Sequence, residues 1–222
     1  MRPTHDTAAD ALLAAAQARG QRALDEHQSK LLLASCGVPV CRETPAADPA
    51  AAARAAAALG FPVALKACGS SLAHKTEVGA VALDLRSPGE VQQAAGRLAA
   101  LPGAESLLVQ EMVPGERELL CGVTWKAGFG PCVAVGLGGV LAEALDQAAL
   151  RLAPLTLADA GEMLEEALPP ALLGPFRSEL PVDRAELCRI LVALGDLAVR
   201  HPLVEQIDIN PLKVRPDGTL VA

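Results

Sequence analysis

A lysine that directly follows an apolar segment is a candidate for binding an anion. Residues 61–65 are apolar, and Lys66 follows them. A lysine on a buried strand is costly unless its ammonium emerges to meet an anion. A lysine that simply reaches solvent at a strand end explains this position equally well when it is taken alone.

The residues after Lys66 favour the anion. Segment 67–77 has no helical or period-two pattern and contains glycine, serine, threonine and a second lysine, Lys75. Small residues with free N–H groups, hydroxyls and two ammonium groups form a credible phosphate cradle. Gly79 would let the backbone approach the phosphates closely. The spacing therefore predicts a loop that binds phosphate.

His74 lies inside this predicted loop, next to Lys75. Nearby positive charge disfavours the imidazolium form, so we expect a neutral ring. A neutral imidazole nitrogen can accept a phosphoryl group. A surface histidine without a chemical role is the alternative.

Asp208 and Asn210 alternate with two isoleucines near the end of the chain. Period-two geometry places the two oxygen-bearing side chains on one face of a strand and the isoleucines on the other. Hard oxygen ligands suit Mg²⁺ bound together with nucleotide phosphates. We expect Pro211 to break the strand, and a merely solvated strand face is the alternative to a metal site.

Two glutamates and a glycine cluster complete the candidates. Glu111 and Glu118 are expected to contact adenine, ribose or Lys66. Residues 136–139 read Gly-Leu-Gly-Gly. Such a cluster predicts a close approach of backbone to a ligand, although by itself it is weak evidence.

Composition excludes several classes of protein. The 222 residues carry a formal net charge of −7, and only 2% of them are aromatic. Scattered basic residues and few aromatics do not fit a nucleic-acid surface. No apolar run approaches the ~20 residues of a membrane helix, and the first residues lack the features of a signal peptide. We therefore expect a cytoplasmic protein that binds neither nucleic acid nor membrane.

Six cysteines occur at irregular spacings, without a CxxC pair or a histidine partner. This spacing does not fit a zinc site, and we expect small, partly buried thiols in a reducing compartment.

Helices and strands are expected to mix along the chain, which predicts an α+β (α/β mixed) fold of two lobes. Residues 1–23 form a helical arm, 24–109 an N-terminal lobe, 110–115 a hinge and 116–222 a C-terminal lobe. The helices are expected at 7–19, 24–36, 49–59, 88–100, 157–168 and from 184 onward. The strands are expected at 38–40, 61–66, 81–85, 107–113, 118–124, 132–135, 204–209 and 212–214, with a last short strand after 218.

Together these segments resemble one family. The motifs occur in order at 61–66 (FPVALK), 74–79 (HKTEVG), 109–113 (VQEMV), 129–131 (FGP), 136–139 (GLGG), 151–155 (RLAPL) and 208–212 (DINPL). This set is similar to the ATP-grasp β subunit, or β-type domain, of ADP-forming acyl-CoA synthetases, from about residue 24 to the end.

The resemblance implies an ATP-grasp fold whose two lobes hold ATP or ADP between them. It implies the reversible reaction acyl-CoA + ADP + phosphate = acid + CoA + ATP, through phosphohistidine. A CoA-binding α subunit is the implied partner, in an α2β2-type assembly, and it carries the main phosphohistidine. The implied roles are a second phosphoryl carrier at His74, nucleotide binding at Lys66, Lys75, Gly79, Glu111, Met112, Val113 and Glu118, and Mg²⁺ binding at Asp208 and Asn210.

The sequence departs from the family pattern at three places. Ala80 stands where the family has a second glycine. Trp125-Lys126 and Asp146-Gln147 replace an Arg-Asp and a Lys-Asp pair. The family also has a metal-binding aspartate beyond the last strand, whereas this sequence ends at Ala222. A non-catalytic nucleotide-binding module, like the one fused to protein acetyltransferases, is the main alternative. A different ATP-grasp carboxylate ligase fits the loop around His74 less well.

Overall fold

The computed structural model describes residues 7–69, 79–139 and 148–222. It separates into two compact units. Unit 1 comprises Met1–Ser35 and Cys41–Met112, and unit 2 comprises Cys36–Val40 and Val113–Ala222. The main boundary between the units lies between Met112 and Val113, and residues 36–40 group with unit 2.

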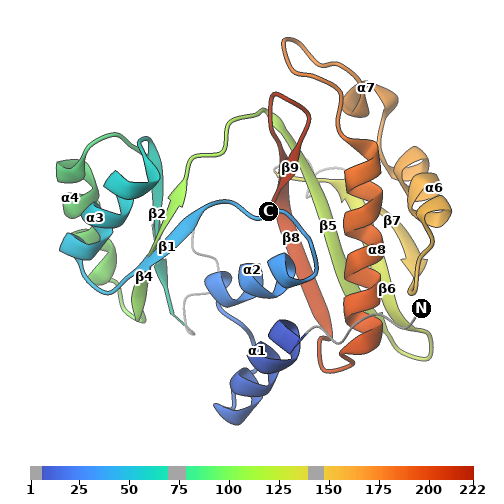
Figure 1. Cartoon of the computed structure of the whole chain (residues 1–222), viewed down its shortest axis with the longest axis horizontal. Helices are drawn as coiled ribbons and strands as arrows, with labels where there is room; N and C mark the ends of the chain where they lie inside the picture. Colours follow the sequence, from blue (N-terminus) through green and yellow to red (C-terminus); the bar gives the residue numbers. More distant parts are fainter. Residues whose placement is uncertain (1–6, 70–78, 140–147) are drawn as a thin grey trace. The chain divides into compact units, whose positions relative to one another are not determined.

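Unit 1 contains a four-stranded antiparallel sheet with strand order β1-β4-β2-β3. Helices α3 and α4 cover one face of this sheet (Figure 1). The strands are β1 (Glu43–Ala46), β2 (Val63–Cys68), β3 (Val81–Leu85) and β4 (Ser106–Glu111). The helices are α1 (Thr7–Ala18), α2 (Glu26–Ser35), α3 (Pro49–Leu59) and α4 (Pro88–Ala99).

Period-two geometry divides the residues of this sheet between two environments. Val63, Leu65 and Val109 are fully buried in the core against α3 and α4. Lys66 and Gln110 occupy alternate positions and therefore point to the opposite face. Glu43 is paired with Gln110 across β1 and β4 and shares that face. We call Glu43, Lys66 and Gln110 the unit 1 polar face.

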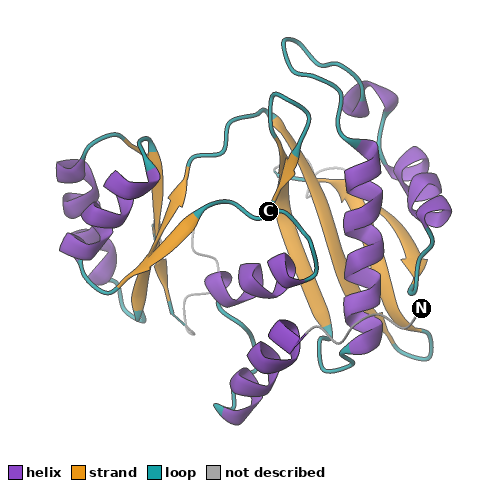
Figure 2. Ribbon diagram, in the orientation of Figure 1, coloured by secondary structure: helices purple, strands orange, loops and turns teal. Residues whose placement is uncertain are grey.

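Unit 2 contains a five-stranded antiparallel sheet with strand order β7-β6-β5-β8-β9. Helices α6 and α8 cover one face (Figure 2). The strands are β5 (Arg117–Lys126), β6 (Gly130–Leu137), β7 (Ala148–Leu152), β8 (Gln206–Val214) and β9 (Leu220–Val221). The helices are α6 (Leu157–Ala167), α7 (Pro170–Leu173) and α8 (Arg184–Arg200).

Sequence signals place the helix ends well. Asp48 caps α3 by accepting a hydrogen bond from the Ala51 amide, as its position before Pro49 predicts. Thr156 and Asp159 form a reciprocal capping box at α6. The apolar stripe predicted for α8 is buried, and it includes Leu187, Ile190, Leu191, Leu194 and Leu197.

Several elements differ from the prediction. No strand forms at 38–40, and β1 forms at Glu43–Ala46 because these residues pair with β4. Strand β2 continues for two residues past Lys66. Strand β7 and the short helix α7 were not predicted at all. Each error reflects pairing or packing with a distant segment, which local pattern does not reveal.

The two strands predicted around Pro211 are one strand, β8. Leu119 of β5 is paired with Leu212, and Cys121 is paired with Ile209. Two residues of β8, Asn210 and Pro211, therefore lie opposite the single residue Leu120. This bulge accommodates a proline, which has no N–H to give to the ladder.

All six cysteines are free thiols, and they are more buried than expected: Cys36 and Cys188 are half-buried, whereas the other four are buried. Burial raises the pKa of Cys121 to about 12, so its thiol stays protonated at neutral pH. No helix in the described part of the chain is both long and apolar enough to cross a membrane.

Candidate nucleotide-binding site

Lys66 lies in the middle of β2 and not at its end. Its Nζ atom is 2.6 Å from Oε1 of Glu26 in α2. About a quarter of the Lys66 side chain is exposed (24%). The ammonium that the sequence assigned to an anion therefore has a fixed carboxylate partner and remains accessible.

Glu26 belongs to a compact group of polar side chains between α2 and the unit 1 polar face. Its Oε1 also accepts a hydrogen bond from Nε2 of Gln110 at 2.7 Å and one from Nζ of Lys30 at 3.4 Å. Gln110 donates a second bond to Oε2 of Glu43 at 2.7 Å, and Lys30 lies 3.2 Å from the same oxygen. His27 Nδ1 lies 2.6 Å from the other Glu43 oxygen. We call Glu26, His27, Lys30, Glu43, Lys66 and Gln110 the unit 1 polar cluster.

Charges within this cluster determine the state of Lys30. Burial alone would lower the pKa of Lys30, but the adjacent Cys41 sulfur and the carboxylates of Glu26 and Glu43 outweigh it and raise the pKa. Lys30 is therefore a firmly protonated cation. It helps to balance the half-buried carboxylate of Glu26 and the nearly inaccessible carboxylate of Glu43, whose desolvation would otherwise be costly.

Glu111, for which the sequence suggested adenine, ribose or Lys66 as a partner, lies at the end of β4 and accepts hydrogen bonds from Arg42. Arg42 donates to it twice, from its backbone N at 3.1 Å and from its Nε at 2.9 Å. Lys66 contacts Glu26 instead. The next residue, Met112, donates its N–H to the Pro62 carbonyl at 3.4 Å, and Val113 begins the following connection with a half-buried side chain.

The polar face of unit 2, opposite α6 and α8, carries the other predicted residues. We define this unit 2 polar face as Glu118, Asp208, Asn210 and Lys213. Glu118 and Lys213 are opposite each other on β5 and β8, with Oε1 and Nζ 3.2 Å apart. The glycine cluster lies beside them. Gly139 has a φ of +61°, and a Cβ there would collide with the Glu118 carboxylate.

Asp208 and Asn210 have the predicted orientation. Both are exposed, whereas Ile209 between them is buried. The Gly139 amide donates to Oδ1 of Asn210 at 2.9 Å, which fixes the amide oxygen. Partial desolvation raises the pKa of the Asp208 carboxyl, although the side chain stays accessible. No hydrogen bond or ion pair from a described residue reaches that carboxylate.

These features fit a divalent cation. Within the described residues no three His, Cys, Asp or Glu side chains gather into a metal cluster. The pair consists of one carboxylate and one amide oxygen, a donor set that suits Mg²⁺, which keeps several waters and binds phosphate oxygens at the same time. The desolvated Asp208 carboxylate would gain a counter-ion.

Two predicted residues, His74 and Lys75, lie outside the described residues. Gly79, directly after that stretch, has a φ of +67°, the left-handed region that favours glycine. Ala80 replaces the second glycine of the family pattern. Its methyl group is fully buried in the unit 1 core, so this departure is accommodated by packing.

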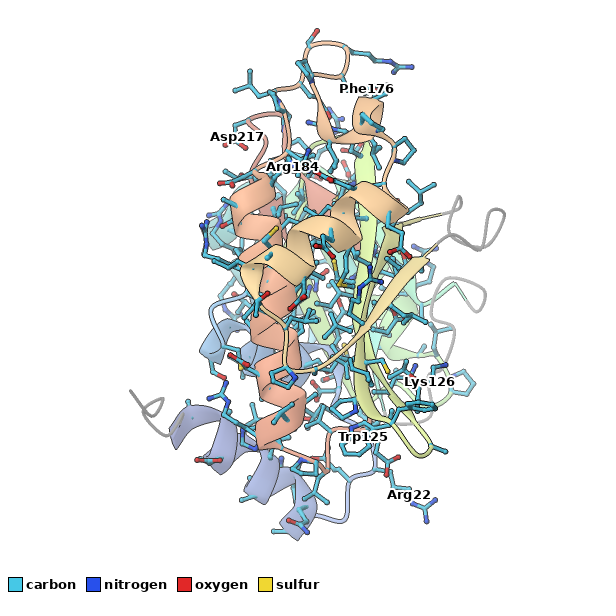
Figure 3. The ribbon with its side chains drawn as sticks, turned by 90° about the vertical axis from the view of Figure 1, so that its right-hand side faces the viewer. Arg22, Trp125, Lys126, Phe176, Arg184 and Asp217 are labelled. Atoms are coloured by element: carbon cyan, nitrogen blue, oxygen red, sulfur yellow. The ribbon has the colours of Figure 1, made fainter. Side chains whose placement is uncertain are left out.

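Of the replaced pairs, Asp146-Gln147 lies outside the described residues, and Trp125-Lys126 lies at the β5–β6 hairpin (Figure 3). Trp125 is partly exposed and donates its indole N–H to the Val204 carbonyl at 3.2 Å. Lys126 lines a shallow hollow of about 210 Å³ together with Phe129, Cys132, Leu150, Arg151 and Leu152. None of the described candidate residues lines this hollow.

Sequence reasoning missed Lys213 of the unit 2 polar face and five members of the unit 1 polar cluster: Glu26, His27, Lys30, Glu43 and Gln110. Two signals were available. Glu26 and Lys30 are four residues apart on one helix, where opposite charges face each other. Gln110 follows the apolar run 107–109, and the period-two pattern places its side chain on the other face of the strand from that of Val109.

The described structure thus has two α+β units, each with an antiparallel sheet that is covered by helices on one face and carries polar side chains on the other. Residues 15–222 match the family model described as "ATP-grasp domain". The chain therefore belongs to the ATP-grasp family.

Relatives narrow this class. The chain is 31% identical over 206 residues to the β subunit of acetate–CoA ligase [ADP-forming] I of Pyrococcus furiosus, covering 90% of this chain and 89% of that subunit. It is 35% identical over 197 residues to acetate–CoA ligase [ADP-forming] II of Archaeoglobus fulgidus, covering 89% of this chain but only 29% of that longer protein. The chain thus belongs with the β subunits and β-type domains of ADP-forming acyl-CoA ligases.

Solved structures agree with this placement. A dinucleotide-forming acetyl-coenzyme A synthetase of Ca. Korarchaeum cryptofilum, in complex with coenzyme A and Ca-AMPCP, superposes with a TM-score of 0.89 at 33% identity. The match covers 96% of both chains. Another structure of that enzyme contains Mg-AMPPCP and a phosphohistidine segment that points towards the nucleotide binding site.

Proposed function

We propose that this chain is the nucleotide-binding, phosphoryl-transferring component of an ADP-forming acyl-CoA synthetase. The reaction converts acyl-CoA, ADP and phosphate to acid, CoA and ATP. The observation that carries the proposal is the fixed, accessible ammonium of Lys66, in a chain that matches ADP-forming β subunits over 90% of its length.

Each polar face would supply a different part of nucleotide binding. On unit 1, Lys66 and Lys75 would neutralise phosphate charge, and Gly79 would allow the loop backbone to approach. The segment Glu111, Met112 and Val113 would bind the base and ribose through its backbone and the Glu111 carboxylate. On unit 2, Glu118 would complete the nucleotide contacts.

Asp208 and Asn210 are the residues that would hold Mg²⁺. The ion would supply charge neutralisation at the phosphate oxygens. Asp208 contributes the carboxylate. Asn210 contributes an amide oxygen that the Gly139 N–H already orients.

His74 is proposed as a phosphoryl carrier. In the direction of ATP formation, the N–P bond of a phosphorylated ring nitrogen breaks while a terminal oxygen of ADP forms the new P–O bond. The released imidazole is neutral and keeps its other ring proton. The acyl-phosphate and CoA steps require a CoA-binding α subunit, and we propose an α2β2-type assembly in the cytoplasm, which the six free cysteines support.

The decisive experiment is co-expression of this chain with a candidate CoA-binding subunit. We expect acyl-CoA-dependent ATP formation from ADP and phosphate, and loss of phosphoryl transfer through this chain in His74→Asn. A stable complex that forms no ATP with any short-chain or aryl acyl-CoA would contradict the proposal. Binding of Mg·ADP without any phosphorylation of His74 would favour the non-catalytic nucleotide-binding module.

A further inference from the structure

Glu26 holds the proposed phosphate-binding lysine from a helix that carries none of the predicted site residues. Its Oε1 accepts three hydrogen bonds, from Lys66 at 2.6 Å, from Gln110 at 2.7 Å and from Lys30 at 3.4 Å. Three donors that converge on one oxygen fix its position. The shortest of the three bonds passes this constraint on to the ammonium of Lys66.

A second layer of contacts holds these donors. Glu43 accepts from both Gln110 and Lys30 through the same oxygen, at 2.7 and 3.2 Å. Gln110 and the side chain of Glu43 are nearly inaccessible to solvent, with 4% and 6% of their surface exposed. Neither residue can reorient without leaving a buried polar group unsatisfied, which is costly. Glu43 therefore fixes two of the donors that hold the Glu26 carboxylate.

The charges of the cluster leave Lys66 available to a ligand. Glu26 and Glu43 balance Lys30 and Lys66, so the cluster is neutral when His27 is neutral. Lys66 is the more exposed of the two cations, at 24% against 13% for Lys30. An ammonium has three N–H donors, and the bond to Glu26 uses one. The other two can bind phosphate oxygens while the ion pair stays intact.

We propose that Glu26 is a positioning residue for nucleotide phosphate binding, which it promotes by holding the Lys66 ammonium in place before the ligand arrives. The inference rests on the proposed function. A free lysine loses rotamer freedom when it binds a phosphate, whereas a lysine already held by Glu26 loses little. The rotamer entropy that Lys66 does not have to lose on binding corresponds to about tenfold higher affinity for a magnesium-bound nucleoside diphosphate.

The test measures binding of Mg·ADP to the full chain by titration calorimetry, with thermal unfolding recorded for every variant. We expect Glu26→Gln to bind about tenfold more weakly than the unmodified chain. Asp84→Asn is the matched control, because it also neutralises an ion-paired carboxylate of unit 1, but Asp84 is paired with Arg86 at 3.0 Å, outside the unit 1 polar cluster. We expect it to leave the affinity within about twofold, well under the tenfold expected for Glu26→Gln.

A double substitution separates positioning from general stability. In a Lys66→Ala background, Glu26→Gln should cause no further loss of affinity, because the lysine it positions is gone. If Glu26→Gln does not fold, Glu26→Asp keeps the charge balance but withdraws the carboxylate by one methylene, and it should weaken binding in the same direction.

Opposite results would overturn the inference. Unchanged or tighter binding by folded Glu26 variants would mean that Glu26 does not position Lys66 or competes with phosphate. If Glu26→Gln lowers the affinity for Mg·ADP equally in the unmodified chain and in the Lys66→Ala background, the role of Glu26 is purely structural. If Lys66→Ala weakens Mg·ADP binding while the Glu26 variants do not, the inference fails and the proposed function stands. If the unmodified chain does not bind Mg·ADP at all, both fail.

Discussion

The two polar faces of this molecule solve different electrostatic problems. On unit 1, the ammonium of Lys66 is held by a carboxylate that is itself held by two further donors. On unit 2, the carboxylate of Asp208 receives no hydrogen bond or ion pair from the described residues, and its pKa is raised by desolvation. The cationic side is pre-organised by protein contacts, whereas the acidic side lacks a described counter-charge.

The two faces therefore differ in what fixes the geometry of their charged side chains. Unit 1 holds its cation with buried neighbours, so its geometry does not depend on a ligand. On the unit 2 polar face Glu118 is paired with Lys213, whereas Asp208 has no such partner among the described residues. A bound Mg²⁺ would provide the missing positive charge there. The two faces should therefore respond differently to substitution and to metal removal.

Asp208→Asn tests the acidic side and should have the largest effect. A metal that clamps transferring phosphate contributes several kcal/mol, so we expect acyl-CoA-dependent ATP formation to fall by about 100-fold or more. The neutral amide should leave the metal-free chain at least as stable, because desolvation already disfavours the Asp208 carboxylate. Steady-state rates and thermal unfolding with and without Mg²⁺ measure both effects. A large loss of stability without metal would show that Asp208 is a structural residue.

Lys66→Ala tests the cationic side. Loss of one charge-assisted contact to phosphate removes about 1.5–3 kcal/mol, so the Kd for Mg·ADP should rise by roughly 10- to 100-fold. The substitution also leaves the Glu26 carboxylate with one donor fewer, so a lower unfolding temperature should accompany it. In contrast to Asp208→Asn, this destabilisation should persist when Mg²⁺ is removed. An unchanged Kd would remove Lys66 from the nucleotide site.

The comparison also explains which parts of the site the sequence could reveal. Period two correctly placed Asp208 and Asn210 together, with Ile209 on the other face, because strand alternation is a local property. The ion pair between Lys66 and Glu26 joins residues 40 positions apart. Sequence alone named Glu111 as a candidate partner, since nothing local indicates that Glu26 of α2 reaches Lys66 of β2.

The fold shows the same division between local and distant causes. Helices α3, α6 and α8 begin at residues that the capping signals predict, since a cap is decided within four residues. Strand β8 was predicted as two pieces because Pro211 was expected to end pairing. Its bulge opposite Leu120 depends on the register with β5, which no local signal specifies.

Gly139→Ala tests how closely the glycine cluster and Glu118 depend on each other. The residue has a φ of +61°, and its new methyl group would displace the Glu118 carboxylate next to Lys213. We expect a loss of about 1–3 kcal/mol in the free energy of unfolding, measured in urea, with weaker Mg·ADP binding. Gly128→Ala is the control, because its φ is +81° and no described atom lies within 4 Å of the added methyl group. Equal affinity of the two variants for Mg·ADP would mean that Gly139 does not influence nucleotide binding through Glu118.

Thr156→Ala tests whether the helix-covered side of unit 2 is independent of its polar face. Thr156 caps α6, and its loss should cost about 1 kcal/mol, or roughly 2–4 °C in unfolding temperature, without changing Mg·ADP affinity. Hydrogen bonds from the Thr156 hydroxyl and backbone lower the pKa of Asp159. A lowered pKa contributes stability at neutral pH that disappears as the pH falls through the folded-state value. The difference in unfolding temperature between variant and unmodified chain should therefore shrink between pH 7 and pH 3. A pH-independent difference would mean that Asp159 takes no part in the cap, and an altered affinity would mean that the two sides of the sheet are coupled.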